Sequence, residues 1–200
     1  GERGRGRCGN IFKVPLLLKE QRVDQIIFNS LRLNRMPAAD LPDWRRIGDI
    51  VDDAKATVTI GVVGKYTGLT DSYLSISKAL FHSAIDAHMK LKIEWIDSSL
   101  LEIAAKSKSP AKYEETWAML KKVDGILIPG GFGDRGVEGK ILAAQYAREN
   151  DVPFLGICLG MQMAVVEFAR NVCGLEDANS AEFDSTNPTP VIVYMPEIST

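Results

Sequence analysis

Gly156-Ile157-Cys158-Leu159-Gly160 decides the fold of this chain, because it marks a sharp turn between two regular elements. The apolar run from Pro153 to Ile157 predicts a buried strand before the cysteine. The amphipathic run after it predicts a helix, with Met161, Ala164, Val165 and Phe168 as its apolar residues. Small residues two positions before and after a nucleophile relieve the crowding at such a turn. Gly156 and Gly160 fill both positions, which is typical of a nucleophile elbow.

At this turn, the sulfur of Cys158 is expected near the free N–H groups at the start of the helix. Their partial positive charge favours the thiolate over the thiol. A buried structural cysteine at a strand-to-helix junction is the alternative, because G-x-C-x-G alone does not separate the two. A second motif favours the reactive cysteine.

That motif is the glycine loop Pro129-Gly130-Gly131-Phe132-Gly133, which follows an apolar strand predicted over Gly125 to Ile128. Backbone with almost no side chains approaches a ligand closely and points N–H groups at negative charge. A helical pattern separates the loop from the cysteine, with Ile141, Leu142, Tyr146 and Ala147 on its apolar side. The loop and Cys158 therefore end successive parallel strands and are expected to share a pocket.

The rest of the chain from Thr57 onward alternates between strand and helix patterns, which predicts an α/β fold with a doubly wound, mostly parallel sheet. Further strands are expected at Thr57 to Val63, Leu91 to Ile96 and Val191 to Tyr194. Helices are expected from Ser72 onward and over Pro110 to Lys122, the latter with Tyr113, Trp117 and Leu120 inward.

The segment before Thr57 has a different pattern. Gly1 to Gly9 is rich in glycine and arginine and is predicted to be disordered. Val14 to Leu33 predicts one helix, with Leu17, Leu18, Ile26, Ile27 and Leu31 in the core. Met36 to Asp43 predicts a break between domains, and Trp44 to Ala56 predicts a charged helix.

The composition is that of a globular enzyme, with 46% hydrophobic residues and a net charge of -2 in 200 residues. This charge gives no general attraction to nucleic acid or to a membrane surface. The three cysteines, Cys8, Cys158 and Cys173, lack C-x-x-C spacing, so neither a disulfide framework nor a metal site is indicated. We expect a cytoplasmic protein without nucleic-acid or membrane partners.

Together, the loop and the elbow resemble the class I glutamine amidotransferases, which have a flavodoxin-like sheet. Longer runs narrow the resemblance to the CTP synthases: Val14 to Leu18, Gly64-Lys65-Tyr66-Thr67, Gly130 to Gly139, Gly156 to Arg170 and Asp177 to Asp184. The run at Gly64 lacks the spacing of a phosphate-binding P-loop. The resemblance implies three segments: 1–35 as the end of a synthetase (amidoligase) domain, 36–56 as a linker, and 57–200 as an incomplete glutaminase domain.

The resemblance also implies a mechanism, in which the Cys158 thiolate attacks the side-chain amide of glutamine and ammonia leaves as a thioester forms. The implied oxyanion-hole donors are the N–H groups of Gly131 and Leu159. The implied glutamine-binding residues are Gly131, Leu159, Gly160, Met161, Gln162 and Glu182. Of these, Glu182 would receive the α-amino group, although a solvated surface charge is the alternative.

In the whole enzyme, the resemblance implies that ammonia converts UTP to CTP with ATP and Mg²⁺, in a tetramer. No cofactor is expected in this portion. GTP activates glutamine hydrolysis in this family, and Phe132, Arg135, Gly136 and Glu138 match the region tied to that effect. An ion pair between Arg135 and Glu138 on the surface is the alternative.

The base of the reaction is not evident in these residues. His82 and His88 follow the helix from Ser72 and are interpreted as surface residues, while the family's histidine and glutamate would lie beyond Thr200. The chain by itself is therefore expected to hydrolyse glutamine negligibly. The alternatives are a non-catalytic pseudo-glutaminase that binds partners, or an elbow-cysteine enzyme of the DJ-1/PfpI-like type.

Overall fold

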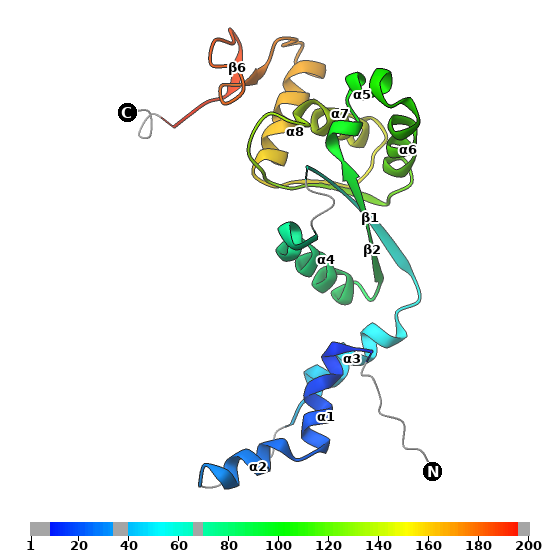
Figure 1. Cartoon of the computed structure of the whole chain (residues 1–200), viewed down its shortest axis with the longest axis vertical. Coiled ribbons are helices and arrows are strands. Elements are labelled where there is room, and N and C mark those ends of the chain that lie inside the picture. Colours follow the sequence, from blue (N-terminus) through cyan, green and yellow to red (C-terminus); the bar gives the residue numbers. More distant parts are fainter. Residues whose placement is uncertain (1–8, 34–39, 66–69, 196–200) are drawn as a thin grey trace. The chain divides into compact units, whose positions relative to one another are not determined.

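A computed structural model describes residues 9–33, 40–65 and 70–195. The chain forms two compact units, one of Gly1–Thr57 with Phe81–Lys90 and the other of Val58–Leu80 with Leu91–Thr200 (Figure 1). Several predictions lie outside the described residues: the disorder of 1–8, the first part of the break at 36–43, Cys8, and the pair Tyr66-Thr67. The division at 35 and 56 stays a prediction.

The first unit begins with a 3₁₀ helix η1 (Ile11–Lys13), followed by α1 (Val14–Glu20), α2 (Val23–Ser30) and α3 (Pro42–Asp53). The prediction of one helix from Val14 to Leu33 was wrong, because Arg22 adopts a left-handed conformation with φ of 57° and separates α1 from α2. The helix predicted over Trp44 to Ala56 is confirmed as α3, which starts two residues earlier at Pro42.

The apolar residues of α1 and α2 do not form the expected core. Their side chains are exposed because no described segment packs over this side of the two helices; they are Leu17, Leu18, Ile26, Ile27 and Leu31. The ordered packing of the first unit lies instead around η1. There the Phe12 ring lies 6.3 Å from that of Trp44 and 5.8 Å from that of Phe81, and Asn10 donates a 2.9 Å hydrogen bond to the carbonyl of Gly48.

The second unit is built on a four-stranded sheet in the order β2-β1-β3-β4. Its strands are β1 (Thr57–Gly64), β2 (Lys90–Asp97), β3 (Gly125–Ile128) and β4 (Phe154–Gly156). β3 pairs in parallel with both β1 and β4. Ile128 is level with Gly156, so the segments that follow β3 and β4 leave the sheet at the same edge. The predicted α/β fold with a parallel sheet is confirmed.

The helical elements between and after these strands are η2 (Thr70–Tyr73), α4 (Leu74–Asp86), η3 (Ser98–Leu100), α5 (Ile103–Lys108), α6 (Pro110–Leu120), α7 (Val137–Glu149) and α8 (Leu159–Asn171). The α-helix expected from Ser72 starts at Leu74, and α5 had no counterpart in the prediction. A second, two-stranded sheet pairs β5 (Asn179–Ser180) with β6 (Pro190–Ile192), where a strand over Val191 to Tyr194 was expected. No helix in the described ranges is long and apolar enough to cross a membrane.

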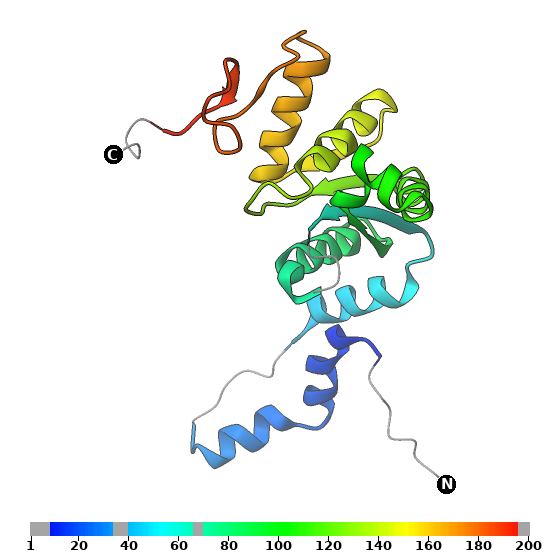
Figure 2. The ribbon, with the colours of Figure 1, turned by 45° about the horizontal axis from the view of Figure 1, so that its top comes forward.

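Helices α7 and α8 lie side by side in the second unit (Figure 2). Buried apolar residues join them to the strands and to the small sheet; they include Ile126, Ile128, Ala143, Ala144, Ile141, Leu159, Met163 and Val166. The prediction of a buried strand before Cys158 was wrong, because β4 is the edge strand of the described sheet and Leu155 is 55% exposed.

The exposed side of α8 also differs from the prediction. Met161, Val165 and Phe168, predicted as its apolar face, are largely exposed. The buried face instead carries Leu159, Gly160, Met163, Val166, Glu167 and Ala169.

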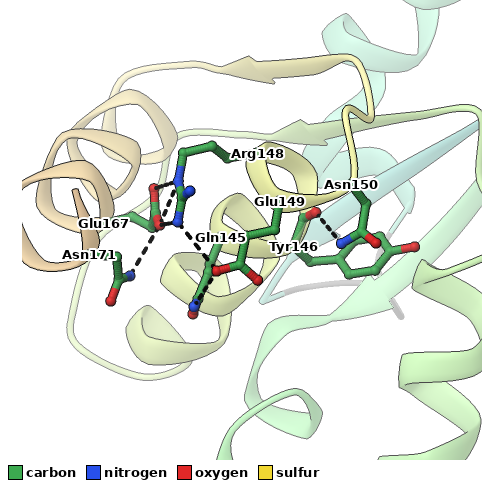
Figure 3. Close-up of polar contacts among 7 residues, drawn as sticks. All are labelled: Gln145, Tyr146, Arg148, Glu149, Asn150, Glu167 and Asn171. Atoms are coloured by element: carbon green, nitrogen blue, oxygen red, sulfur yellow. Dashed lines mark hydrogen bonds and ion pairs between the residues drawn. The ribbon is translucent and has the colours of Figure 1, made fainter.

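A buried ion pair ties α7 to α8 (Figure 3). The Glu167 side chain is 3% exposed, and the Arg148 guanidinium donates to it from Nη2 to Oε1 at 2.8 Å and from Nε to both carboxylate oxygens at 3.1 and 3.2 Å, a bidentate arrangement. Asn171 donates a further hydrogen bond of 3.1 Å to the same carboxylate. Because a buried carboxylate needs a partner for its charge, this pair fixes the register of the two helices.

We expect Arg148→Met to lower the melting temperature by several degrees, because it leaves the Glu167 carboxylate buried without its cation. The double variant Arg148→Met/Glu167→Met should recover most of this loss, since apolar pairs often replace buried ion pairs without loss of stability. Thermal denaturation followed by circular dichroism measures both. A double variant less stable than Arg148→Met would contradict a purely electrostatic role for the pair.

Gly139 makes the closest helix contact of the second unit. A Cβ built on it would lie 1.7 Å from the carbonyl oxygen of Ser98 in η3, so any side chain would push α7 away. Ordinarily, Gly→Ala inside a helix stabilises it by about 1 kcal/mol.

We therefore expect Gly139→Ala to destabilise the protein, against the sign of helix propensity. Gly48→Ala in α3 is the matched control, because the nearest atoms to its added Cβ belong to the flexible side chain of Lys13. Urea denaturation of both variants measures the difference. Equal stability of Gly139→Ala and the unmodified chain would show that α7 moves freely relative to η3.

Candidate functional site

Cys158 is the N-cap residue of α8 and has φ of 53° and ψ of -111°. This conformation is rare for a residue with a side chain and costs on the order of 1–3 kcal/mol. The thiol is exposed, so strain and access coincide at this residue. The predicted strand–turn–helix with Cys158 at its apex is present.

The two glycines that flank the cysteine are required by close backbone contacts. A Cβ on Gly160 would lie 2.0 Å from the carbonyl oxygen of Ile128, and a Cβ on Gly156 would lie 2.6 Å from the backbone nitrogen of Met161. Real Cβ atoms do not approach other atoms so closely. Helix α8 therefore starts directly against the end of β3, which brings Cys158 to the glycine loop.

The structure brings the loop and the cysteine together. A Cβ on Gly130 would lie 3.3 Å from Cβ and 3.7 Å from Sγ of Cys158. Within the described residues, the N–H groups of Gly131 and Leu159 donate no hydrogen bond, whereas those of Gly160 and Gln162 donate to Ile157 and Cys158. Leu159 is the first residue of α8, where a helix leaves N–H groups unsatisfied. The N–H groups of one loop residue and of the residue after Cys158 are thus without a partner among the described residues.

Lys65, which follows β1, binds the backbone of the glycine loop. Its ammonium group donates to the carbonyl of Phe132, at 2.8 Å, and to that of Gly133. Burial lowers the pKa of Lys65, the charge of Arg135 acts in the same direction, and the carboxylates of Asp134, Glu182 and Glu102 partly offset it. The two hydrogen bonds from the Lys65 ammonium group therefore fix the backbone of the loop.

Lys140, in the first turns of α7, also lies close to the loop. Its side chain is 1% exposed, and a Cβ on Gly131 would lie 3.8 Å from its Nζ. No carboxylate or hydrogen-bond acceptor among the described residues pairs with this ammonium group. Burial, and to a smaller extent the charge of Lys65, lower its pKa to about 8, while the charge of Cys158 acts in the opposite direction.

Sequence reasoning missed both lysines, although one signal was present. Val137, Ile141 and Ala144 form the apolar stripe of α7, and Lys140 occupies a position within that stripe. A lysine on the buried side of a helix is rare without a partner, so this position pointed to a charged group facing inward. The contacts of Lys65 had no comparable signal, because they depend on where the end of β1 meets the loop.

Gln162 and Glu182, which are both predicted to bind glutamine, differ in their exposure to solvent. The Oε1 atom of Gln162 is buried and has no hydrogen-bond partner among the described residues. Glu182 is exposed in the turn after β5, and its charge acts on Lys65. The site therefore contains one unsatisfied acceptor in the first turn of α8 and one exposed carboxylate on the side of Lys65.

The residues predicted for the GTP effect lie in the loop and in the first turn of α7. Phe132 is 90% exposed, and Gly136 is a left-handed residue directly before α7. The alternative of a pair between Arg135 and Glu138 was wrong. Instead, Arg135 lies 3.6 Å from Asp97, and Glu138 lies 3.1 Å from Arg170, because Glu138 is inside α7 and faces α8.

Other candidates do not join this site. His82 and His88 are exposed and belong to the first unit. The largest described pocket, of about 690 Å³, lies between α6 and α7 around Trp117 and Tyr146, and Cys158 does not line it. The chemistry is therefore concentrated where β1, β3 and β4 end, at the edge where α/β sheets carry their sites.

The sequence profile of the family described as "Glutamine amidotransferase class-I" matches residues 68–190, more than half of the chain. The chain belongs to the class I glutamine amidotransferases. Among relatives, this amidotransferase is 53% identical over 191 residues to the CTP synthase of Carboxydothermus hydrogenoformans and 50% identical over 190 residues to CTP synthase 1 of Homo sapiens.

These matches cover 95% and 94% of the amidotransferase chain but only 34% and 32% of the two relatives. The chain thus spans about a third of the length of the curated relatives it matches. A solved structure of the Trypanosoma brucei CTPS glutaminase domain with bound acivicin is also similar, with a TM-score of 0.62 and 42% identity. That similarity covers 70% of this chain and 51% of the other.

Burial of Lys140 predicts a pH-dependent stability of this amidotransferase. The pKa of this lysine is about 8 in the folded chain and 10.5 when exposed. Between these values the unfolded chain binds more protons, so the free energy of unfolding rises with pH. Below pH 8, the buried charge therefore lowers stability by roughly 3 kcal/mol.

We expect Lys140→Met to be more stable than the unmodified chain at pH 7 and to lose this advantage between pH 8 and 10.5. Lys112→Met, at an exposed position on α6, is the control and should show no such trend. Urea denaturation at a series of pH values measures all three. A variant that is less stable at pH 7, with a constant difference at higher pH, would rule out the buried ammonium as the cause.

Proposed function

We propose that this chain is the glutaminase portion of a CTP synthase and that it releases ammonia from glutamine through a thioester on Cys158. The contact between Gly130 and Cys158 carries this proposal, because it sets backbone N–H donors beside a nucleophile at the apex of an elbow. The family membership and the similarity to CTP synthases support it. Residues 57–200 are proposed as the glutaminase segment, 36–56 as a linker and 1–35 as the end of the synthetase segment.

In the proposed reaction, the thiolate of Cys158 forms a bond to the amide carbon of glutamine, and negative charge develops on the amide oxygen. The N–H groups of Gly131 and Leu159 stabilise this oxyanion; one such donor is worth on the order of 10²- to 10³-fold in rate. The C–N bond then breaks, the nitrogen takes up a proton and ammonia leaves. Water hydrolyses the thioester to glutamate and restores the thiol.

Recognition of glutamine is proposed for the first turn of α8 and for Glu182, with Gly160 and Met161 completing the turn. The buried, unpartnered Oε1 of Gln162 is an acceptor that suits a donor group of the substrate. Glu182 is exposed, and a carboxylate is the natural partner of the substrate's ammonium group. These two groups would hold the ends of glutamine while Cys158 attacks its amide.

The wider activity is also a proposal, in which ammonia serves a cytoplasmic, tetrameric enzyme that converts UTP to CTP. ATP and Mg²⁺ belong to the synthetase reaction, and GTP would act near Phe132, Arg135, Gly136 and Glu138. The described residues contain no group of three or more His, Cys, Asp or Glu side chains that could hold a metal ion.

The test uses the full-length protein that contains this chain. We expect Cys158→Ala to abolish CTP formation from glutamine, and Glu182→Gln to raise the KM for glutamine about 10- to 150-fold, the value of a charge-assisted hydrogen bond. Both variants should form CTP from added ammonia at a nearly normal rate, because ammonia bypasses the glutamine site.

Asp184→Asn is the matched control for Glu182→Gln. Asp184 is two residues away, but its carboxylate accepts hydrogen bonds from the N–H and hydroxyl groups of Thr186, so its loss should leave the KM for glutamine unchanged. Normal glutamine kinetics in Cys158→Ala would overturn the proposed function. Normal kinetics in Glu182→Gln alone would remove Glu182 from the site.

A further inference from the structure

Lys140 is the buried charge of the second unit that the proposed reaction does not use. Its ammonium group faces the backbone of the glycine loop, with Nζ 3.8 Å from the place of a Cβ on Gly131. On the neighbouring residue, a Cβ on Gly130 would lie 3.7 Å from Sγ of Cys158. Of two neighbouring residues without side chains, Gly131 therefore lies close to a buried cation and Gly130 close to the thiol.

The charges around Lys140 leave it without a counter-ion. The carboxylates of Glu138 in α7 and Glu167 in α8 are paired with Arg170 and Arg148. The remaining charges of the loop and the adjacent turns, Asp134, Arg135, Glu102 and Glu182, act on Lys65. The charged groups that act on Lys140 itself are Lys65, which repels it, and Cys158, which attracts it in the thiolate form.

We propose that Lys140 is a positioning residue whose buried ammonium group stabilises the thiolate of Cys158 through the side-chain-free backbone of Gly130 and Gly131. A cation beside a cysteine favours its thiolate, and the effect of a charge increases where little water separates the two groups. Because the pKa of Lys140 is about 8, most of these lysines are charged at neutral pH. The inference rests on the proposed role of Cys158 as nucleophile and adds a second source of thiolate stabilisation to the start of α8.

The chain's own residues explain why such a cation lies in the core. An exposed lysine would be hydrated and screened by salt, so its effect on the sulfur would be small. Lys140 is instead buried within the apolar stripe of α7, with its Nζ close to Gly131 of the loop. Lys65 does not duplicate this role, because its ammonium group is bound to the carbonyl groups of Phe132 and Gly133.

The experiment measures the rate of alkylation of Cys158 by iodoacetamide in the whole 200-residue chain between pH 6 and 9.5, with peptide mapping to separate it from Cys173. Lys140→Met removes the charge, Lys140→Arg keeps it, and Lys112→Met is the control on an exposed face of α6. Cys173, an exposed thiol beyond the end of α8, is the internal control in every sample.

We expect Lys140→Met to slow alkylation of Cys158 at pH 7 about five- to tenfold and to change the shape of its pH profile, because the thiolate loses a nearby cation. Lys140→Arg and Lys112→Met should stay within about twofold of the unmodified chain, and Cys173 should react alike in all four. An unchanged profile in Lys140→Met would overturn the inference. An equal shift in Lys140→Met and Lys140→Arg would also overturn it, because the cause would then be packing.

Alkylation requires neither glutamine nor ammonia transfer, so this result is independent of the proposed function. A shifted profile in the chain, combined with normal glutamine kinetics of Cys158→Ala in the full-length protein, would retain the link between Lys140 and the thiol and reject the glutaminase. An unchanged alkylation profile in Lys140→Met, combined with loss of CTP formation from glutamine in Cys158→Ala, would retain the glutaminase and reject the role of Lys140.

Discussion

The close approach of α8 to the end of β3 is the constraint on which the site depends. With Gly160 against the carbonyl group of Ile128, the helix begins at the sheet edge itself and not at the end of a loop. This contact forces the turn at Cys158 to be tight, and the left-handed backbone of the cysteine follows from it. The glycine loop leaves β3 from the same point, so the contact also determines which backbone meets the sulfur.

Two lysines complete the surroundings of this loop with different physical roles. The ammonium group of Lys65 donates hydrogen bonds to carbonyl groups of the loop and thereby fixes its backbone. The ammonium group of Lys140, near Gly131, has no acceptor among the described residues. The buried charge of Lys140 lowers the stability of the fold, whereas the charge of Lys65 is paired with acceptors. A stability cost of this kind is common at functional sites.

Most of the elements of the second unit could be predicted from local patterns, because strand, elbow and helix each have a short-range signature. G-x-C-x-G, followed by an amphipathic run, located Cys158 and its glycines correctly. Exposure was predicted less well: Leu17 and Ile26 were assigned to a core, and Leu155 to a buried strand, although all three are exposed. Apolar character indicates that a residue is suited to burial, but only tertiary contacts decide whether anything covers it. Lys140 is the opposite case, a polar residue whose burial depends on packing between elements distant in sequence.

The pairing of Arg148 with Glu167 has a consequence for how the site can be controlled. It holds together α7 and α8, the helices that carry Lys140 and Cys158. The packing of these two helices therefore sets the distance between the ammonium group and the sulfur. Gly131, proposed above as an oxyanion donor, lies instead on the loop whose carbonyl groups Lys65 binds. In the proposed mechanism, the strength of the nucleophile and the stabilisation of the transition state therefore depend on different contacts. A signal that moved the loop would switch turnover while leaving the reactivity of the thiol unchanged.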